Sequence, residues 1–137
     1  MINTLKILAL NKKEPKWYYP EVKGQPPSPR YDHTMEYYPS LNALIIYGGR
    51  CDRSVGFHEL KEIRMYNLMV MMWSSVQING DRPDARYLHC SAIFEDKLLI
   101  FGGLSNYSLK ESQIIMVELS SYFYLIQHQL VLSYLRS

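Results

Sequence analysis

Short apolar runs, separated by polar, glycine-containing or proline-containing turns, recur along the chain. Residues 43–47 (Ala-Leu-Ile-Ile-Tyr) and 98–101 (Leu-Leu-Ile-Phe) are unbroken, and runs of this length are typical of strands buried on both faces. Residues 60–67 alternate between apolar and polar positions, which indicates a half-buried strand. The same reasoning predicts strands at residues 5–10, 17–19, 31–37, 73–78 and 87–94, and one that ends at 119. The pattern therefore predicts an all-β chain.

The turn residues reveal an internal repeat. Segments 17–49 and 73–103 carry Trp, Gly, Pro, Arg, Tyr, His, an apolar run and a Gly-Gly pair in the same order. The Trp, Gly, Pro, Arg and His markers each recur at an offset of 56 residues. The offset falls to 54 at the Gly-Gly pair, because the second copy has a shorter turn before its apolar run. A period of this size predicts an array of similar structural units.

Each unit has room for four short antiparallel strands, with the Gly-Gly pair after the second, which is typical of a β-propeller blade. We therefore expect a repeat region at residues 1–119. It would comprise a half-blade at 5–24, a blade at 25–79 and a three-stranded partial blade at 80–119. Residues 120–137 contain no glycine, proline or acidic residue and form an atypical C-terminal tail that the repeat does not explain.

Composition narrows the class of protein. The 137 residues are 47% hydrophobic and 20% charged, as in a soluble globular domain. The net charge is only +2 and the basic residues are dispersed among acids, so we expect no nucleic-acid site. No stretch reaches the ~20 apolar residues that span a membrane. Cys51 and Cys90 occupy non-equivalent repeat positions, which favours free thiols and a cytoplasmic location over a disulfide or a metal pair.

The repeated residues resemble the kelch motif, in which Arg and His open the first strand, Gly-Gly follows the second, an aromatic lies in the third and Trp in the fourth. The resemblance covers roughly residues 5–119, and the next expected Trp is absent after it. It implies a partial kelch-type β-propeller with four-stranded antiparallel blades and an incomplete ring, since closed propellers have about four to eight blades. The motif falls on Trp17, Arg30, His33, Gly48, Gly49, Tyr66, Trp73, Arg86, His89, Gly102 and Gly103.

The resemblance implies structural roles for these markers. Trp17, Tyr66 and Trp73 would be buried between neighbouring blades. The two arginines would reach carboxylates or carbonyls of an adjacent blade, because a buried guanidinium needs acceptors. The two histidines, repeated once per blade, would be structural rather than metal ligands. No Ser-His-Asp order, His-Glu-x-x-His or phosphate-binding glycine loop is present, so we expect no enzyme activity and no cofactor.

Kelch propellers present the loops after the second and fourth strands of each blade on one face. Here these loops are residues 50–59, 104–108 and 77–84, and they differ from one another although the strands match. That contrast is expected when a scaffold repeats and its contacts do not. The resemblance therefore implies a non-catalytic protein-interaction module that binds a protein partner. The candidate contact residues are Arg50, Asp52, Arg53, His58, Arg82, Asp84, Asn106 and Tyr107.

Charge reversal at Arg50 and Arg53 is expected to weaken partner capture without changing stability, because rim charges act mainly on association. Two alternatives stay open. The chain could be a truncated kelch protein without independent function, or a kelch-propeller enzyme of the oxidase or sugar-epimerase type. The oxidase would need a copper site, for which Cys51 is present but converging histidines are not. An incomplete ring also predicts self-association through open sheet edges.

Overall fold

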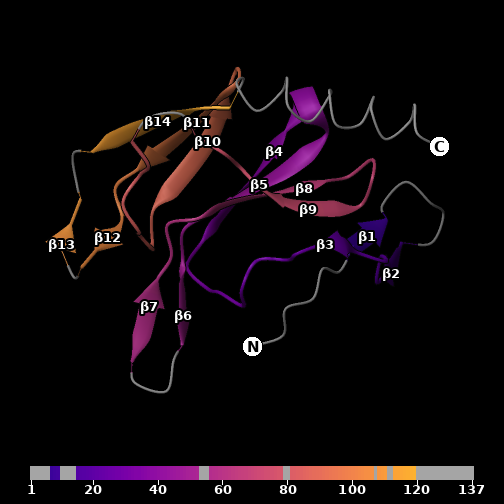
Figure 1. The fold of residues 1–137 in the computed structure, drawn as a ribbon, viewed down its shortest axis with the longest axis horizontal. Helices are drawn as coiled ribbons and strands as arrows, with labels where there is room; N and C mark the ends of the chain where they lie inside the picture. The colour runs from indigo at the N-terminus through magenta and orange to yellow at the C-terminus, as the bar shows by residue number, and fades with distance from the viewer. Residues whose placement is uncertain are drawn as a thin grey trace.

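The computed structural model describes residues 7–9, 15–52, 56–78, 81–106, 108–110 and 113–119. Within these residues the regular structure is antiparallel strand, apart from one short parallel pairing and the single 3-10 turn η1 (Pro39–Leu41). The fold is therefore all-β and consistent with a partial kelch propeller (Figure 1). The tail 120–137 and the candidate residues Arg53 and Tyr107 lie outside the described residues.

The first sheet holds the four strands predicted for the complete blade. These are β4 (Thr34–Tyr38), β5 (Ala43–Tyr47), β8 (Ile63–Asn67) and β9 (Met72–Ser75), each antiparallel to the next. Strand β5 forms because its apolar side chains fill both faces of the sheet. The half-buried strand predicted for residues 60–67 is wrong for β8, because both of its faces are covered and all five of its residues are buried, Arg64 and Asn67 included.

A short fifth strand, β3 (Lys23–Gly24), pairs parallel with β9. Gly24 makes this pairing feasible. Its φ is +75°, and a Cβ there would lie 2.2 Å from the Trp73 carbonyl oxygen. Prolines 26, 27 and 29 prevent a longer strand, because proline cannot donate to the ladder.

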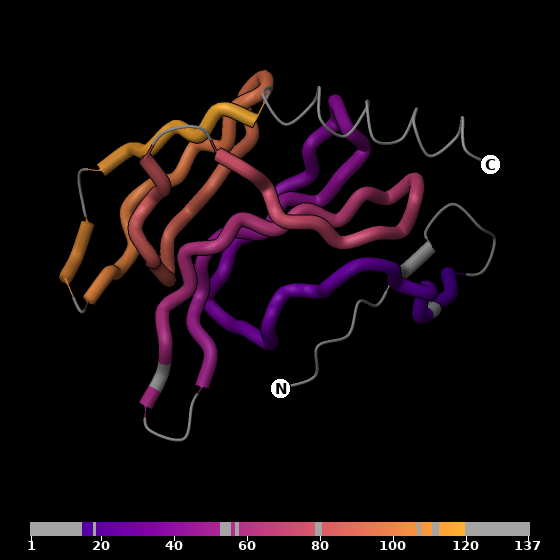
Figure 2. The backbone as a smooth tube through the Cα atoms, viewed as in Figure 1, coloured from indigo at the N-terminus to yellow at the C-terminus, as the bar shows by residue number. Residues whose placement is uncertain are grey.

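The second sheet contains β10 (Cys90–Phe94), β11 (Lys97–Phe101) and β14 (Ile114–Glu118), in the order β10–β11–β14. Its hairpin repeats that of β4 and β5 with a shorter turn, where Glu95 takes a positive φ of 53°. In Figure 2 the chain passes from the first sheet through residues 81–86 into the second, so the two sheets lie beside each other. Three strands are therefore described here, as predicted for residues 87–119.

Two narrow ribbons extend the sheets beyond the glycine pairs. The first joins β6 (Arg50–Asp52) to β7 (Phe57–Glu59), and the second joins β12 (Leu104–Ser105) to β13 (Ser108–Leu109). Sequence reasoning described these segments as polar loops, and that part of the prediction is wrong. Backbone hydrogen bonds alone build the ribbons, so they need no apolar alternation.

The N-terminal strands β1 (Ile7–Ala9) and β2 (Lys16–Tyr18) form a separate antiparallel hairpin. Trp17 lies on β2 and is 54% exposed, so the expectation that it is buried between blades is wrong. The physical reason is that this sheet has only two strands among the described residues and offers no broad face to cover an indole.

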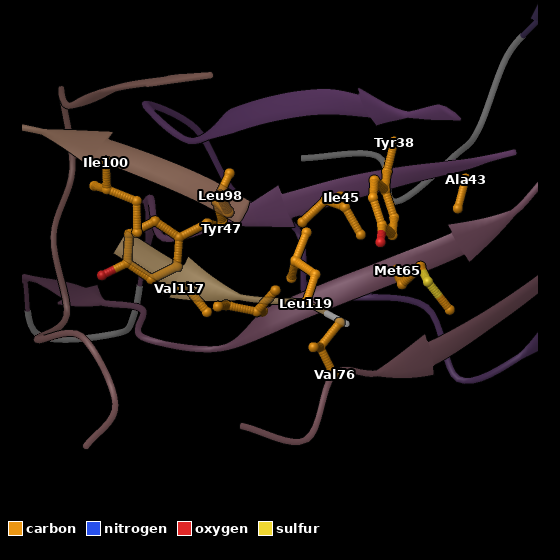
Figure 3. Close-up of a cluster of buried hydrophobic side chains, with 11 residues drawn as sticks. Tyr38, Ala43, Ile45, Tyr47, Met65, Val76, Leu98, Ile100, Val117 and Leu119 are labelled. Atoms are coloured by element: carbon orange, nitrogen blue, oxygen red, sulfur yellow. The ribbon is translucent and has the colours of Figure 1, made fainter. Parts of the chain in front are cut away.

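The main core lies between the two sheets. In Figure 3, Tyr47 of the first sheet lies beside Ile100 and Val117 of the second. A smaller cluster covers the opposite face of the first sheet, where Tyr66 and Trp73 are buried with their ring centroids 5.0 Å apart. The side chains of the main core are Tyr38, Ala43, Ile45, Tyr47, Ile63, Met65, Val76, Leu98, Ile100, Val117 and Leu119.

Candidate partner-binding surface

Three variable segments lie at one end of the two sheets, which we call the ribbon end: the ribbons β6–β7 and β12–β13 and the connector 81–86. Both ribbons leave their sheets at the glycine pairs (Figure 1). The connector is held there because the Tyr47 hydroxyl donates to the Asp84 carbonyl oxygen at 2.6 Å. The backbone N–H of Asn106 donates to both carboxylate oxygens of Glu59, at 2.9 and 3.1 Å. The predicted loops 50–59 and 104–108 therefore lie together, and Asp84 of the predicted loop 77–84 is held at Tyr47, close to the start of the first ribbon.

The glycine pairs let the backbone pass close to the repeated histidines. A Cβ at Gly49 would lie 2.8 Å from the His33 Cβ, and a Cβ at Gly103 would lie 2.8 Å from the His89 Cβ. Both glycines have positive φ, of 89° and 87°. The same close approach in both copies explains why the pattern Gly-Gly with His recurs.

The repeated arginines hold the ends of their own blades together. Arg86 is fully buried, and it donates to the Gly102 carbonyl oxygen and to the Gln113 side-chain oxygen, each at 3.0 Å. Arg30 donates to the Gly48 carbonyl oxygen at 3.0 Å and pairs with Glu62. The prediction of carbonyl and carboxylate acceptors was right, but their place in an adjacent blade was wrong. Each arginine lies four residues before its own first strand, within reach of its own second strand.

The two histidines have different surroundings. His89 is buried, with Nε2 2.8 Å from the Thr34 Oγ1 and its ring edge-on to Tyr47 at 5.0 Å. Burial, together with the positive charges of Arg86 and His33, lowers the pKa of His89 to about 4. His89 is therefore neutral at pH 7. His33 is exposed at its equivalent position, and partial desolvation with the Arg30 charge also lowers its pKa.

Arg50 joins the two sheets at the ribbon end. Its guanidinium carbon lies 4.8 Å from the ring centroid of Tyr31 and 4.6 Å from that of Tyr87, and its Nε donates to Asp32 at 2.8 Å. Desolvation opposes the charge, but the Asp32 carboxylate outweighs it and raises the pKa of Arg50. Reversing this charge would put a carboxylate beside Asp32 and two aromatic faces, so these contacts favour a loss of stability at Arg50 in addition to weaker partner capture.

The other described candidate residues expose their side chains at this end. Asp52 accepts a hydrogen bond from the Tyr31 hydroxyl at 2.7 Å, and that bond raises the pKa of Tyr31. The rest of the exposed set is His58, Arg82, Asp84 and Asn106.

Sequence reasoning missed three residues that organise this surface: Tyr31, Asp32 and Glu59. Tyr31 was detectable, because Tyr87 repeats it. Asp32 and Glu59 were not, because leucines stand at the matching positions of the second copy.

Two further findings concern the chemistry that the described residues offer. Within the described ranges, no group of three or more His, Cys, Asp or Glu side chains is placed to hold a metal ion. No helix in that part of the chain is long and apolar enough to cross a membrane.

Known proteins are similar to this chain in sequence over most of its length. Kelch domain-containing protein 1 of Homo sapiens is 36% identical over 96 residues, which are 68% of this chain and 22% of that protein. The leucine-zipper-like transcriptional regulator 1 homolog of Drosophila melanogaster is 33% identical over 99 residues, 71% of this chain and 10% of that protein. The Rab9 effector protein with kelch motifs of Mus musculus is 31% identical over 97 residues, 71% of this chain and 25% of that protein.

The chain therefore spans about a tenth to a quarter of the length of these relatives. A family model, the KLHDC2/KLHL20/DRC7 Kelch-repeats domain, matches residues 2–124. The glycine pairs, the buried arginine and the two main sheets described above lie within this match. The chain belongs to the kelch-repeat family.

Proposed function

We propose that this chain is a non-catalytic protein-interaction module and that it binds its partner at the ribbon end. The observation that carries the proposal is the convergence of three segments with unlike sequences on one end of a repeated scaffold, held by the Asn106–Glu59 and Tyr47–Asp84 hydrogen bonds. Rigid strands that position variable, exposed segments are the usual arrangement of a recognition surface. One relative is named an effector of Rab9, which is a protein-directed role in that relative.

The exposed charges of the ribbon end set the kind of contact expected. Asp52 and Asp84 carry negative charge, while Arg82 lies between Asp81 and Pro83 in the connector. Charges at the rim of an interface mainly control the association rate and the choice of partner. We therefore expect a partner surface with complementary charges, bound more weakly as the salt concentration rises.

The test is capture of partners from a cell extract by the tagged chain, followed by binding measurements with each captured protein in pure form. Arg82→Glu and Asp84→Lys change exposed side chains at the ribbon end and leave the backbone acceptor of Asp84 in place. Glu95→Lys, in the turn at the other end of the second sheet, is the matched control. Binding that persists in both ribbon-end variants would place the contact elsewhere.

The two alternatives predict different results in the same preparation. A truncated kelch protein without independent function would capture no partner reproducibly. A kelch-propeller oxidase would contain copper, which metal analysis of the purified protein would detect. We also propose a cytoplasmic location, on the basis of the two free thiols of Cys51 and Cys90, and fluorescence microscopy of the tagged chain would test it.

A further inference from the structure

The second sheet has an apolar face that points away from the first sheet. Strand register assigns this face, because directly paired residues of an antiparallel sheet lie on the same side. Phe94, Ile114 and Met116 are each 60–66% exposed. The only charged pair on this face, Lys97 and Glu118, lies at one end. We call it the outer face: Cys90, Ala92, Phe94, Lys97, Leu99, Phe101, Ile114, Met116 and Glu118.

The repeat shows what this face does in the first sheet. Tyr38, Ile45 and Met65 stand at the positions of Phe94, Leu99 and Met116, and they are only 1–2% exposed. They are covered by the second sheet, with which they form the main core. The outer face is thus the second copy of a surface that packs against another sheet, and none of the described residues covers it in the same way.

The side of β10 that packs on the first sheet also has a counterpart in the first copy of the repeat, on β4. Ser91 and Ile93 of β10 face the first sheet across the junction, and their equivalents on β4 are Met35 and Tyr37. Met35 and Tyr37 are 53% and 51% exposed. Residues 22–27 cover the neighbouring part of that face, so the available surface is the β4 side alone. The chain therefore exposes counterparts of both halves of its own junction.

The two exposed halves match each other in polarity. At the junction the Ser91 hydroxyl donates to the Glu36 carboxylate at 2.7 Å. The equivalent pair across the exposed halves would be Met35 with Ala92, and both are apolar. Polar side chains of the first sheet are also replaced on the outer face, where Cys90 stands for Thr34 and Phe94 for Tyr38. The junction has a hydrogen-bonded polar pair, and the contact between the exposed halves would have an apolar pair. Neither contact would therefore bury a polar group without a hydrogen-bond partner at this position.

We propose that a second copy of this chain docks on the outer face through the exposed side of its β4 strand, head to tail. This contact is separate from the ribbon end and leaves that end open. It joins unlike surfaces, so repeated docking produces a ring when the rotation closes and a chain of copies when it does not. It differs from edge-to-edge pairing, because side chains of two faces pack and no new strand ladder forms.

Three exposed methionines give a matched test. Met116 lies on the outer face, Met35 on β4, and Met69 in the turn before β9, away from both. Light scattering coupled to size-exclusion chromatography should show the mass of the full chain rising above 16.1 kDa with concentration. Met116→Glu and Met35→Glu should each weaken this association by about thirtyfold or more, the effect of losing one strong contact residue. Met69→Glu should behave as the unaltered chain.

Mixing the variants identifies the geometry. Met116→Glu keeps an intact β4 side and Met35→Glu keeps an intact outer face, so an equimolar mixture should form one-to-one dimers and stop there. Circular dichroism checks that each variant is folded, and Ile114→Ser on the same face replaces Met116→Glu if the latter is unfolded.

Two outcomes would overturn the proposal. The first is an unaltered chain that stays monomeric over the whole concentration range, which would mean that no second copy covers the outer face. The second is association that Met116→Glu blocks and Met35→Glu leaves unchanged, with no rescue on mixing. That result would show two outer faces packing symmetrically on each other.

Discussion

The two copies of the repeat share their strands and differ in what lies against them. The first sheet packs its inter-sheet face on the second, and a Cβ at Gly48 would lie 2.5 Å from the Arg86 carbonyl oxygen of the neighbour. At the matching Gly102 the nearest atom to such a Cβ, the Lys110 carbonyl oxygen, is 3.8 Å away. Glycine is therefore required by close neighbouring atoms at position 48, whereas the space around position 102 would admit a side chain. Sequence similarity between repeats predicts shape, while the neighbour decides how much each position contributes to stability.

The largest expected effect comes from the paired positions Tyr47 and Phe101. Tyr47 is buried in the main core and donates to Asp84, so Tyr47→Ala should lower the free energy of unfolding by about 3–5 kcal/mol. Phe101 is 37% exposed on the outer face, and Phe101→Ala should cost about 1 kcal/mol. Urea unfolding at low protein concentration measures both. Equal losses would mean that the two faces are equally covered.

Substitutions at the equivalent glycines Gly48 and Gly102 should differ in the stability that they cost, in the same direction but by a smaller amount. Both positions have positive φ, which costs an L-residue about 1–2 kcal/mol. Gly48→Ala adds a clash with backbone and His89, so we expect a loss of about 2–4 kcal/mol against about 1–2 for Gly102→Ala. Thermal melts of the two variants would decide. A Gly102→Ala variant as unstable as Gly48→Ala would contradict the open position of Gly102.

The histidines give a pH-dependent form of the comparison. The folded pKa of His89 lies below its unfolded value of 6.5, at about 4, so the fold favours the neutral ring. Above pH 6.5 both states are neutral and His89 has no effect. Between pH 6.5 and 4 the unfolded chain binds a proton that the folded chain does not. The free energy of unfolding therefore decreases as the pH is lowered through this range, by roughly 2 kcal/mol.

His89→Gln should flatten the stability profile between pH 6.5 and 5, a range where most carboxylates stay ionised. His33→Gln, at the exposed equivalent, should flatten it less. Denaturant titrations at several pH values provide the measurement. An unchanged slope in His89→Gln would show that His89 is not held neutral in the folded protein.

The smallest effect is expected at the ribbon end. Arg50→Gln removes the cation that lies close to the rings of Tyr31 and Tyr87, together with its pairing to Asp32, so this variant should unfold at a lower denaturant concentration than the unaltered chain. Arg82→Gln, which changes an exposed side chain of the connector, should cost less than about 0.5 kcal/mol. Chemical denaturation of the two variants under the same conditions would distinguish them. If Arg50→Gln left the stability unchanged, Arg50 would not stabilise the contact between the two sheets.

The sequence patterns that predicted the fold correctly were those that depend on which residues are buried. The runs 43–47 and 98–101 are strands because apolar side chains on both faces need partners, and the Gly-Gly pairs mark close backbone approaches. The ribbons were missed because backbone pairing leaves no apolar signature. Trp17 was misjudged because burial depends on the neighbouring strands and not on residue type. The Glu59–Asn106 contact joins side chain to backbone across repeats, so no pattern within one repeat could reveal it.

The two-residue strand β3 has a consequence for aggregation. It occupies the outer edge of β9, where the Lys23 N–H donates to the Met71 carbonyl oxygen at 2.9 Å. A bare edge strand is a template on which another chain can extend a sheet, and a very short covering strand blocks that growth without offering a long edge of its own. Gly24 is the residue that allows the cover to lie so close to Trp73. Replacing it with valine should bare the edge and shorten the lag time of thioflavin-positive fibril formation, whereas the same replacement at the unobstructed Gly56 should not.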